Sequence, residues 1–135
     1  MLGKFQQSHL RIELAAPATI IRESLLDTTN LRQWLWTQRL SPGLPEKLTP
    51  ELTFTSYIGL IAIEHKVEIA DRSCLRLLLS GGIDGYHEWC WGDGWVEARL
   101  EGISLLPLNL GQTISLLSFR QFVTDRAKTT PKTSG

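Results

Sequence analysis

The side chains best suited to chemistry lie in segment 85–95, where two strand-like runs meet at the dipeptide Asp93-Gly94. This segment contains one of the chain's three histidines and three of its five tryptophans, namely His87, Trp89, Trp91 and Trp95. An imidazole can hydrogen-bond a ligand or transfer a proton near neutral pH, and indole rings provide large apolar walls. The combination predicts a cavity with aromatic walls and a polar group, but it does not name the molecule inside.

The dipeptide Asp93-Gly94 predicts a β-hairpin with a two-residue type I′ turn, because both residues tolerate positive φ angles. The expected pairs are Trp91 with Val96, Trp89 with Ala98 and His87 with Leu100 on one face, and Cys90 with Glu97, Glu88 with Arg99 and Tyr86 with Glu101 on the other. This register puts apolar partners on one side and opposite charges on the other. A loop one residue longer would turn Glu97, Arg99 and Glu101 toward the tryptophans and favour an enzyme.

His65 is a second polar candidate, because it interrupts an apolar strand face in the run 60–70. The residues expected on that face are Ile61, Ile63, His65, Val67 and Ile69. His65 and His87 could each contact a ligand or act as acid or base, or each could be a core histidine that a carbonyl or water satisfies. No inward carboxylate is evident to orient either ring as a general base, so we assign no catalytic residue.

The candidate cavity residues come from these strand faces and from the helical segment that precedes them. They are His65, His87, Trp89, Trp91, Ile63, Leu77 and Trp34. For Trp89 and Trp91 the alternative is that the rings fill the core rather than stack on a flat or polycyclic ligand.

Length and composition predict a single domain over residues 1–127 and a disordered polar tail over 128–135. Fourteen basic and fourteen acidic residues cancel, so the basic face of a nucleic-acid-binding protein is not expected. The longest apolar runs, such as 57–63, are too short for a transmembrane segment, and no signal peptide is recognised. We expect a cytoplasmic protein.

The two cysteines, Cys74 and Cys90, fall in neighbouring predicted strands on the outer face. A cross-strand disulfide is conceivable if the loop between the strands has three residues, but in a cytoplasmic protein the prediction is two reduced cysteines. Two cysteines without clustered histidines or carboxylates do not form a zinc site. We therefore predict no metal and no cofactor.

The remaining pattern predicts a mixed fold. A strand over 5–14 precedes short helices over 18–26 and 31–36 and a proline-containing loop over 41–50. Strands follow over 52–58, 60–70 and 74–80, then the hairpin to about residue 106, and a helix capped by Asn109 that runs to about Arg126. Asp27-Thr28-Thr29-Asn30 supplies the cap candidates of the second helix.

The C-terminal helix is apolar on two sides, which indicates that it contacts more than the sheet. Leu110, Ile114 and Leu117 are the residues that could cover the sheet, and we expect the first strand, the long loop or the short helices to cover the side of Leu116, Phe119 and Val123. The alternative is that this second side meets a second subunit, another protein or a membrane surface.

This order of elements resembles the helix-grip fold of the START and Bet v 1-like superfamily, also called SRPBCC proteins. The matching residues are the strand Leu10-Arg11-Ile12-Glu13-Leu14, the helix entry Ala16-Pro17-Ala18 and the helix Leu31-Arg32-Gln33-Trp34. The match covers about residues 5 to 126. It implies an α+β fold, in which a curved antiparallel sheet wraps around a long C-terminal helix after two short helices. In relatives, a tapered cavity binds lipids, sterols, polyketides or other apolar molecules.

The resemblance implies a carrier or sensor of a small hydrophobic ligand, lipid-like or polycyclic, with His65 and His87 as polar anchors. Some relatives are cyclases or hydrolases and others are chaperone co-factors, but no residue set of these activities is recognised here. One alternative is an enzyme of the cyclase or hydratase type that uses a cavity histidine. Another is a protein-interaction module with a collapsed pocket, which would bind a homodimer partner or another protein through the C-terminal helix.

Overall fold

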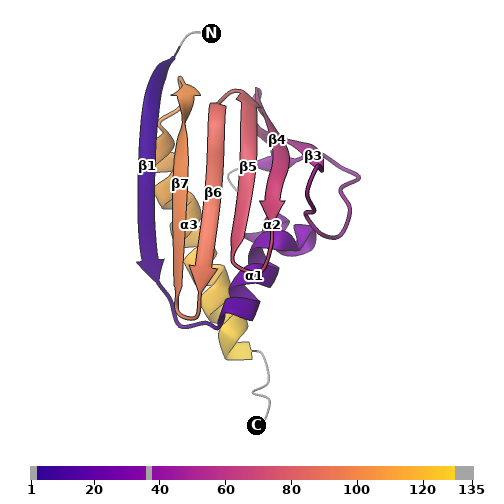
Figure 1. The fold of residues 1–135 in the computed structure, drawn as a ribbon, viewed down its shortest axis with the longest axis vertical. Helices are drawn as coiled ribbons and strands as arrows, with labels where there is room; N and C mark the ends of the chain where they lie inside the picture. Colours follow the sequence, from indigo (N-terminus) through magenta and orange to yellow (C-terminus); the bar gives the residue numbers. More distant parts are fainter. Residues whose placement is uncertain (1–2, 36–37, 130–135) are drawn as a thin grey trace.

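The computed structural model describes residues 3–35 and 38–129, which form a seven-stranded antiparallel sheet and three helices. In chain order the elements are β1 Lys4–Glu13, α1 Ala18–Leu26, α2 Thr28–Trp34, β2 Arg39–Leu40, β3 Thr53–Ile58, β4 Ile61–Ala70, β5 Cys74–Gly81, β6 Asp84–Gly92, β7 Trp95–Ser104 and α3 Leu108–Thr129. The strand order is β1-β7-β6-β5-β4-β3-β2, so the first strand pairs with the last (Figure 1). The predicted α+β class is confirmed.

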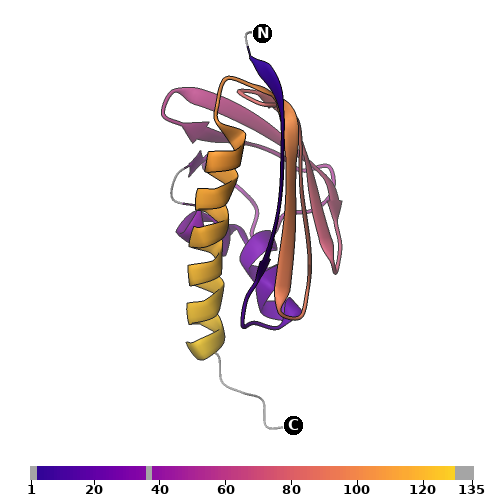
Figure 2. The ribbon, with the colours of Figure 1, turned by 90° about the vertical axis from the view of Figure 1, so that its left-hand side faces the viewer.

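The long helix α3 lies along one face of the sheet, and α1 and α2 are on the same side (Figure 2). The region of β3 and β4 bends over toward the first turns of α3, which gives the sheet its curvature. The predicted architecture, a curved sheet around a long C-terminal helix, is therefore confirmed. Among the described residues, no helix is long and apolar enough to cross a membrane.

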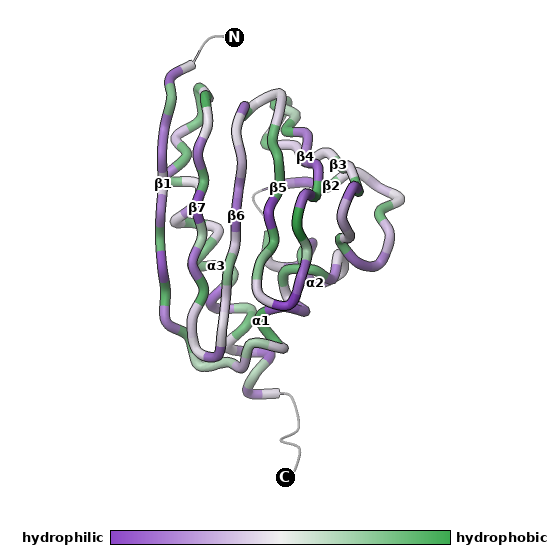
Figure 3. Tube along the Cα trace, in the orientation of Figure 1, coloured by the Kyte–Doolittle hydropathy of each residue, from purple (hydrophilic) through white to green (hydrophobic). Residues whose placement is uncertain are grey.

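Alternating side chains decide which face of each strand meets α3. In β5, Leu75, Leu77 and Leu79 are buried, whereas Arg76 faces outward and pairs with Glu88. Figure 3 shows how polar and apolar residues alternate along the strands. The outer face of the sheet is therefore polar, and the core lies between the sheet and the helices.

The hairpin of β6 and β7 has the predicted register, with His87 opposite Leu100 and a two-residue loop. The predicted type I′ turn is wrong: Gly94 has a φ of 81°, but Glu51 is the only non-glycine with positive φ in the described residues. The side chain of Asp93 instead accepts a hydrogen bond from the backbone N of Ala18, 2.7 Å away. The turn thus caps the N-terminus of α1 as well as reversing the chain.

The boundaries of α2 and α3 differ from the predicted ones. Asp27 caps α2, because its Oδ1 accepts from the backbone N of Thr29 at 2.9 Å; the helix therefore begins at Thr28. Asn109 does not cap α3, which begins one residue earlier and runs to Thr129, two residues into the predicted tail. Residue 36, the predicted end of the second helix, and the rest of the tail lie outside the described residues.

The side of α3 that was predicted to cover the sheet is largely exposed, whereas the other side is covered within the chain, as expected. Leu116, Phe119 and Val123 are buried against the sheet and the short helices. Leu110 and Leu117 are 57% and 59% exposed. Phe119 is buried because its ring packs edge-on against Trp34 and tilted against Trp89, which together form the aromatic core.

The apolar face of β4 is shorter than predicted. A register shift between Val67 and Ile69 turns Ile69 outward, and Ile61 at the start of the strand is also exposed. A β-bulge of this kind reverses the side-chain alternation beyond it. Ile63, His65 and Val67 remain on the buried face.

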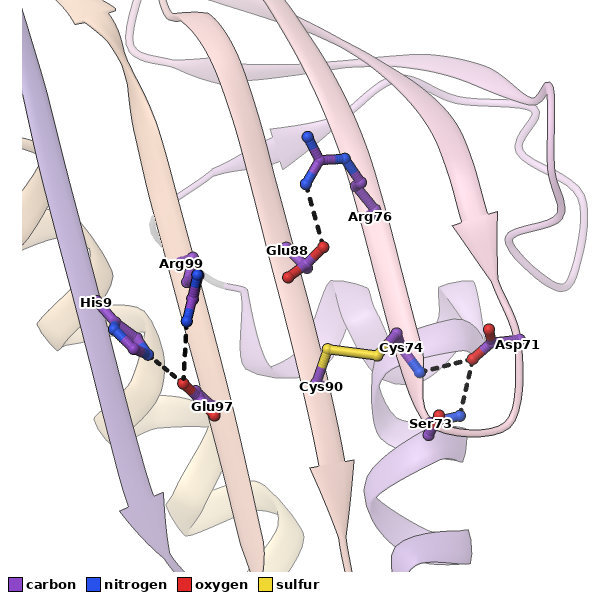
Figure 4. The surroundings of a disulfide bond; sticks show 9 residues. All are labelled: His9, Asp71, Ser73, Cys74, Arg76, Glu88, Cys90, Glu97 and Arg99. Carbon is purple, nitrogen blue, oxygen red and sulfur yellow. Dashed lines mark hydrogen bonds and ion pairs between the residues drawn. A yellow bond between two sulfur atoms is a disulfide. The ribbon is translucent and has the colours of Figure 1, made fainter.

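The prediction of two reduced cysteines is wrong, because Cys74 and Cys90 form a disulfide (Figure 4). The register of β5 and β6 sets these residues directly opposite each other, with Cα atoms 4.2 Å apart. Asp71 fixes the turn before Cys74 by accepting from the backbone N of Ser73 and of Cys74. The disulfide lies on the outer face, behind the aromatic core.

Candidate functional site: a cavity between the sheet and the first half of helix α3

A cavity of about 230 Å³ separates the sheet from the first turns of α3. The sheet residues that line it include Ile58, Ile63, His65, Leu79, His87 and Leu100. From α3 come Leu108, Leu110, Gly111, Gln112, Ile114 and Ser115, and the other lining residues are Gln38, Ile83, Leu106 and Pro107. Because Leu110 is largely exposed and also lines the cavity, the cavity reaches the surface beside α3.

Gln6 on β1 fixes the chain where the sheet passes into α3. Its Nε2 donates to the backbone O of Ser104 at 3.0 Å and of Leu106 at 2.8 Å. Its Oε1 accepts from the backbone N of Leu108 at 3.2 Å. One glutamine side chain thereby holds the three-residue connection that forms part of the cavity lining.

His65 on β4 is buried, and Phe54 stacks on its ring with the centroids 4.5 Å apart. Its Nε2 hydrogen-bonds Ser56 Oγ at 2.9 Å, whereas its Nδ1 is buried without a partner. Burial lowers the pKa of His65 to about 4, because removing water disfavours the charged ring. The imidazole is therefore neutral at pH 7.

His87 on β6 lies on the same face, opposite Leu77. Its Nε2 is buried and has no hydrogen-bond partner among the described residues. Burial, together with repulsion from His65, lowers the pKa of His87 to about 3. The cavity thus contains two neutral imidazoles, each of which can donate from one nitrogen and accept at the other.

Gln112 on α3 provides a polar group on the opposite wall. Asn109 Nδ2 donates to Ser8 Oγ at 3.0 Å, and the Ser8 hydroxyl donates to Gln112 Oε1. The Nε2 of Gln112 is left without a partner, although the residue is almost fully buried. In this orientation of the amide, the Ser8 hydroxyl hydrogen has an acceptor and the NH₂ group of Gln112 is the unpaired end.

Among the described residues, buried side-chain atoms without a hydrogen-bond partner belong mainly to residues that line this cavity. Five buried side-chain atoms lack a partner in the described residues, and four belong to cavity-lining residues: Gln38 Oε1, His65 Nδ1, His87 Nε2 and Gln112 Nε2. Leaving such an atom unpaired costs about 1–3 kcal/mol. A molecule in the cavity with matching polar groups would recover part of that cost.

Three of the seven predicted cavity residues, Ile63, His65 and His87, line the cavity. Trp34, Trp89, Trp91 and Leu77 do not, because they are packed into the core next to it. The amides of Gln38 and Gln112 were missed by the sequence analysis. A single glutamine between apolar residues does not by itself indicate a cavity, so neither was singled out.

An inward carboxylate that could orient His65 or His87 as a general base is not found in the described residues. Ser56 is the hydrogen-bond partner of His65, and it is fully buried and does not line the cavity. The described lining contains no Asp, Glu, Lys or Arg. In residues 3–35 and 38–129, no group of three His, Cys, Asp or Glu side chains could hold a metal ion.

Solved structures of distant sequence share this architecture. Protein CV1439 from Chromobacterium violaceum has a TM-score of 0.68 at 15% identity, over 87% of this chain and 97% of that chain. Major latex-like protein 151 from Panax ginseng has a TM-score of 0.65 at 8% identity, over 93% of this chain and 99% of that chain. The Aha1 dimer from Colwellia psychrerythraea gives 0.61 at 15% identity, over 88% and 96%.

These likenesses show the fold alone. The chain has the helix-grip architecture of latex-like, Bet v 1-like proteins, as the sequence resemblance predicted. No family profile and no curated protein matches the sequence.

Proposed function

We propose that the protein binds a small apolar ligand in the cavity between the sheet and α3, as a carrier or sensor. The observation that supports this most is the concentration of unpaired polar atoms in an otherwise apolar lining. A histidine or glutamine that only fills a core normally has its hydrogen bonds satisfied. Four such side chains around one space are better explained as anchors for a ligand.

The size of the cavity narrows the predicted ligand. A volume of about 230 Å³ is below the roughly 300–1,000 Å³ of sites for drug-sized molecules. A ligand of one or two rings therefore suits the cavity better than a long lipid or a large polycyclic molecule.

Binding of naphthalene, followed by isothermal titration calorimetry, tests this function. We expect one naphthalene per chain. The variant Gly111→Trp should weaken binding at least tenfold, because Gly111 lines the cavity and a Cβ added there meets no atom within 4 Å. The control Gln121→Trp places the same side chain at an exposed position of the same helix and should bind as the wild type does. Equal naphthalene binding by both variants would contradict the function, as would a wild type that binds neither naphthalene nor a carbonyl compound of similar size.

We also propose a partner contact through the C-terminal helix, but at other residues than those considered from the sequence. Leu110 and Leu117 are the exposed leucines of α3, so a second copy would meet these rather than the buried Phe119. Sedimentation velocity tests the contact. A wild-type dimer that Leu117→Glu dissociates supports a homodimer, and a monomeric wild type contradicts it.

The disulfide makes the predicted cytoplasmic location testable. Disulfides persist in oxidising compartments and are rare in the cytosol. Trapping free thiols in lysed cells with a maleimide reagent would show whether Cys74 and Cys90 are paired there. Labelling of both cysteines supports the cytoplasm, and no labelling supports an oxidising compartment.

A further inference from the structure

The cavity has two hydrogen-bond donors whose directions are set by neighbouring groups. The first is His65. Ser56 Oγ is buried, and its hydrogen-bond partner in the described residues is His65 Nε2. If the hydroxyl donates, Nε2 accepts and the ring proton is on Nδ1; the reverse arrangement would leave both the hydroxyl hydrogen and the Nδ1 lone pair unpaired. The favoured tautomer therefore presents Nδ1–H as an unused donor.

The second donor is the Gln112 amide. Ser8 Oγ accepts from Asn109 Nδ2, so its own hydrogen is free to donate to Gln112 Oε1. Turning the amide over would give Ser8 two incoming donors and no acceptor for its hydrogen. The NH₂ group of Gln112 is thus the unpaired end in this arrangement. It is on α3, whereas His65 is on β4, so the two donors belong to opposite walls.

The cavity also disfavours a charged ligand. The described lining holds no Asp, Glu, Lys or Arg side chain, and the low pKa values of His65 and His87 keep both rings neutral at pH 7. An ionised carboxylate in this space would be buried without a counter-charge, which is strongly unfavourable. A carbonyl oxygen avoids that cost and has two lone pairs with which to accept hydrogen bonds.

We propose that the cavity selects a compact, uncharged molecule with carbonyl-type oxygen, such as a ketone, lactone or ester, which accepts hydrogen bonds from His65 Nδ1–H and the Gln112 amide. This inference rests on the proposed ligand-binding function and specifies its ligand class. Such a cavity would prefer carbonyl compounds to hydrocarbons, which would leave both donors unpaired. It would also prefer them to fatty acids, because the lining has no Lys or Arg to pair with a carboxylate.

Three probes of nearly equal size test the selection at pH 7: α-tetralone, tetralin and the tetralin carboxylate. We expect α-tetralone to bind about tenfold more tightly than tetralin, because each hydrogen bond contributes modestly to the net affinity. The carboxylate should bind most weakly. A purely apolar cavity would show the opposite order for the first two probes, since tetralin is the more hydrophobic.

Variants identify the donors. His65→Phe and Gln112→Met should each reduce the affinity for α-tetralone toward that for tetralin. Retained tetralin binding shows that the variant cavity is folded. The control His9→Phe changes an exposed histidine of the outer face and should leave all three affinities unchanged.

The outcomes separate the two proposals. Tetralin binding as tightly as α-tetralone, tightest binding of the carboxylate, or a tetralone preference that survives both variants would overturn the carbonyl selection while the binding function stands. If none of the three probes nor naphthalene binds the wild type, the binding function itself fails.

Discussion

The two ends of the interface between the sheet and α3 are built from the same strands but are filled differently. At one end, Trp34, Trp89 and Phe119 pack edge-on or tilted with ring centroids 4.9–5.7 Å apart. At the other end, the first turns of α3 face a cavity of about 230 Å³. The comparison indicates that the aromatic end supplies the packing, and that the cavity end can therefore remain hollow.

The two ends also differ in how far their polar side chains are hydrogen-bonded. At the aromatic end, Trp34 Nε1 donates to the backbone O of Ser24 at 2.8 Å, and Ser118 Oγ donates to the backbone O of Trp34 at 2.6 Å. At the cavity end, four side chains keep unpaired atoms. Trp91 Nε1 is an exception in the packed core, and nothing in the structure explains it.

Alanine substitutions at two leucines of β5 test the difference in packing between the two ends. Leu75 is opposite Trp89 in the packed end, whereas Leu79 lines the cavity. Leu75→Ala should lower the free energy of unfolding by about 4 kcal/mol, and Leu79→Ala by about 2 kcal/mol, because Leu79 already borders empty space. Urea denaturation checks both. Equal losses would mean that the cavity end is packed as tightly as the aromatic end.

The disulfide should stabilise the packed end without affecting the cavity. It joins residues 16 positions apart, and closing a loop of that length contributes about 3 kcal/mol. The double variant Cys74→Ser with Cys90→Ser should lose about that much stability in urea denaturation and still bind naphthalene. Lost binding in the folded double variant would show that the two ends are coupled.

Acid should destabilise the cavity end through its two histidines. Their folded-state pKa values, about 4 for His65 and about 3 for His87, lie below the ordinary 6.5. Below pH 6.5 the unfolded chain therefore binds more protons than the folded one. The contribution of the two histidines to the free energy of unfolding is therefore fully present above pH 6.5. It falls on acidification by on the order of 1 kcal/mol per pH unit for each histidine.

Thermal melts from pH 7 to pH 4 check this dependence. His65→Phe should flatten it in part, whereas His9→Gln on the outer face should leave the histidine contribution unchanged. A wild-type melting temperature that is constant from pH 6.5 to pH 4.5 would contradict the burial of both rings as neutral groups.

The smallest effect is expected at Gly111. A Cβ there meets no atom within 4 Å, so Gly111→Ala should stabilise α3 by about 0.5–1 kcal/mol. Gly102→Ala is the matched control, because its Cβ would lie 2.6 Å from the backbone O of Asp84. In thermal melts, we expect a higher melting temperature for Gly111→Ala and a lower one for Gly102→Ala. Destabilisation by Gly111→Ala would show that the cavity mouth needs the glycine.

The hairpin register was predictable because the two constraints agree: Asp93-Gly94 sets the loop length, and the apolar alternation sets the face. The same alternation could not show which residues of that face lie in the packed aromatic end and which line the cavity. His87, Trp89 and Trp91 share one face at equal spacing, and what lies over each depends on α2 and α3, which are far away in the sequence.

The face of α3 was not predictable for a related reason. Both of its sides carry three apolar residues, and Phe119 is buried only because Trp34 and Trp89 lie beside it. Gln112 was overlooked because its role depends on Ser8, which lies on the first strand. The cysteine pairing required the β5–β6 register, which the sequence left open.

Methyl NMR of the wild-type protein during a naphthalene titration tests the difference between the two ends most directly. We expect the largest shifts at Ile63, Leu79 and Leu100, which line the cavity. The methyls of Leu75, Val96 and Val123 in the packed core should shift little. Shifts confined to the exposed Leu110 and Leu117, or largest in the packed core, would contradict a ligand-binding cavity at the first half of α3.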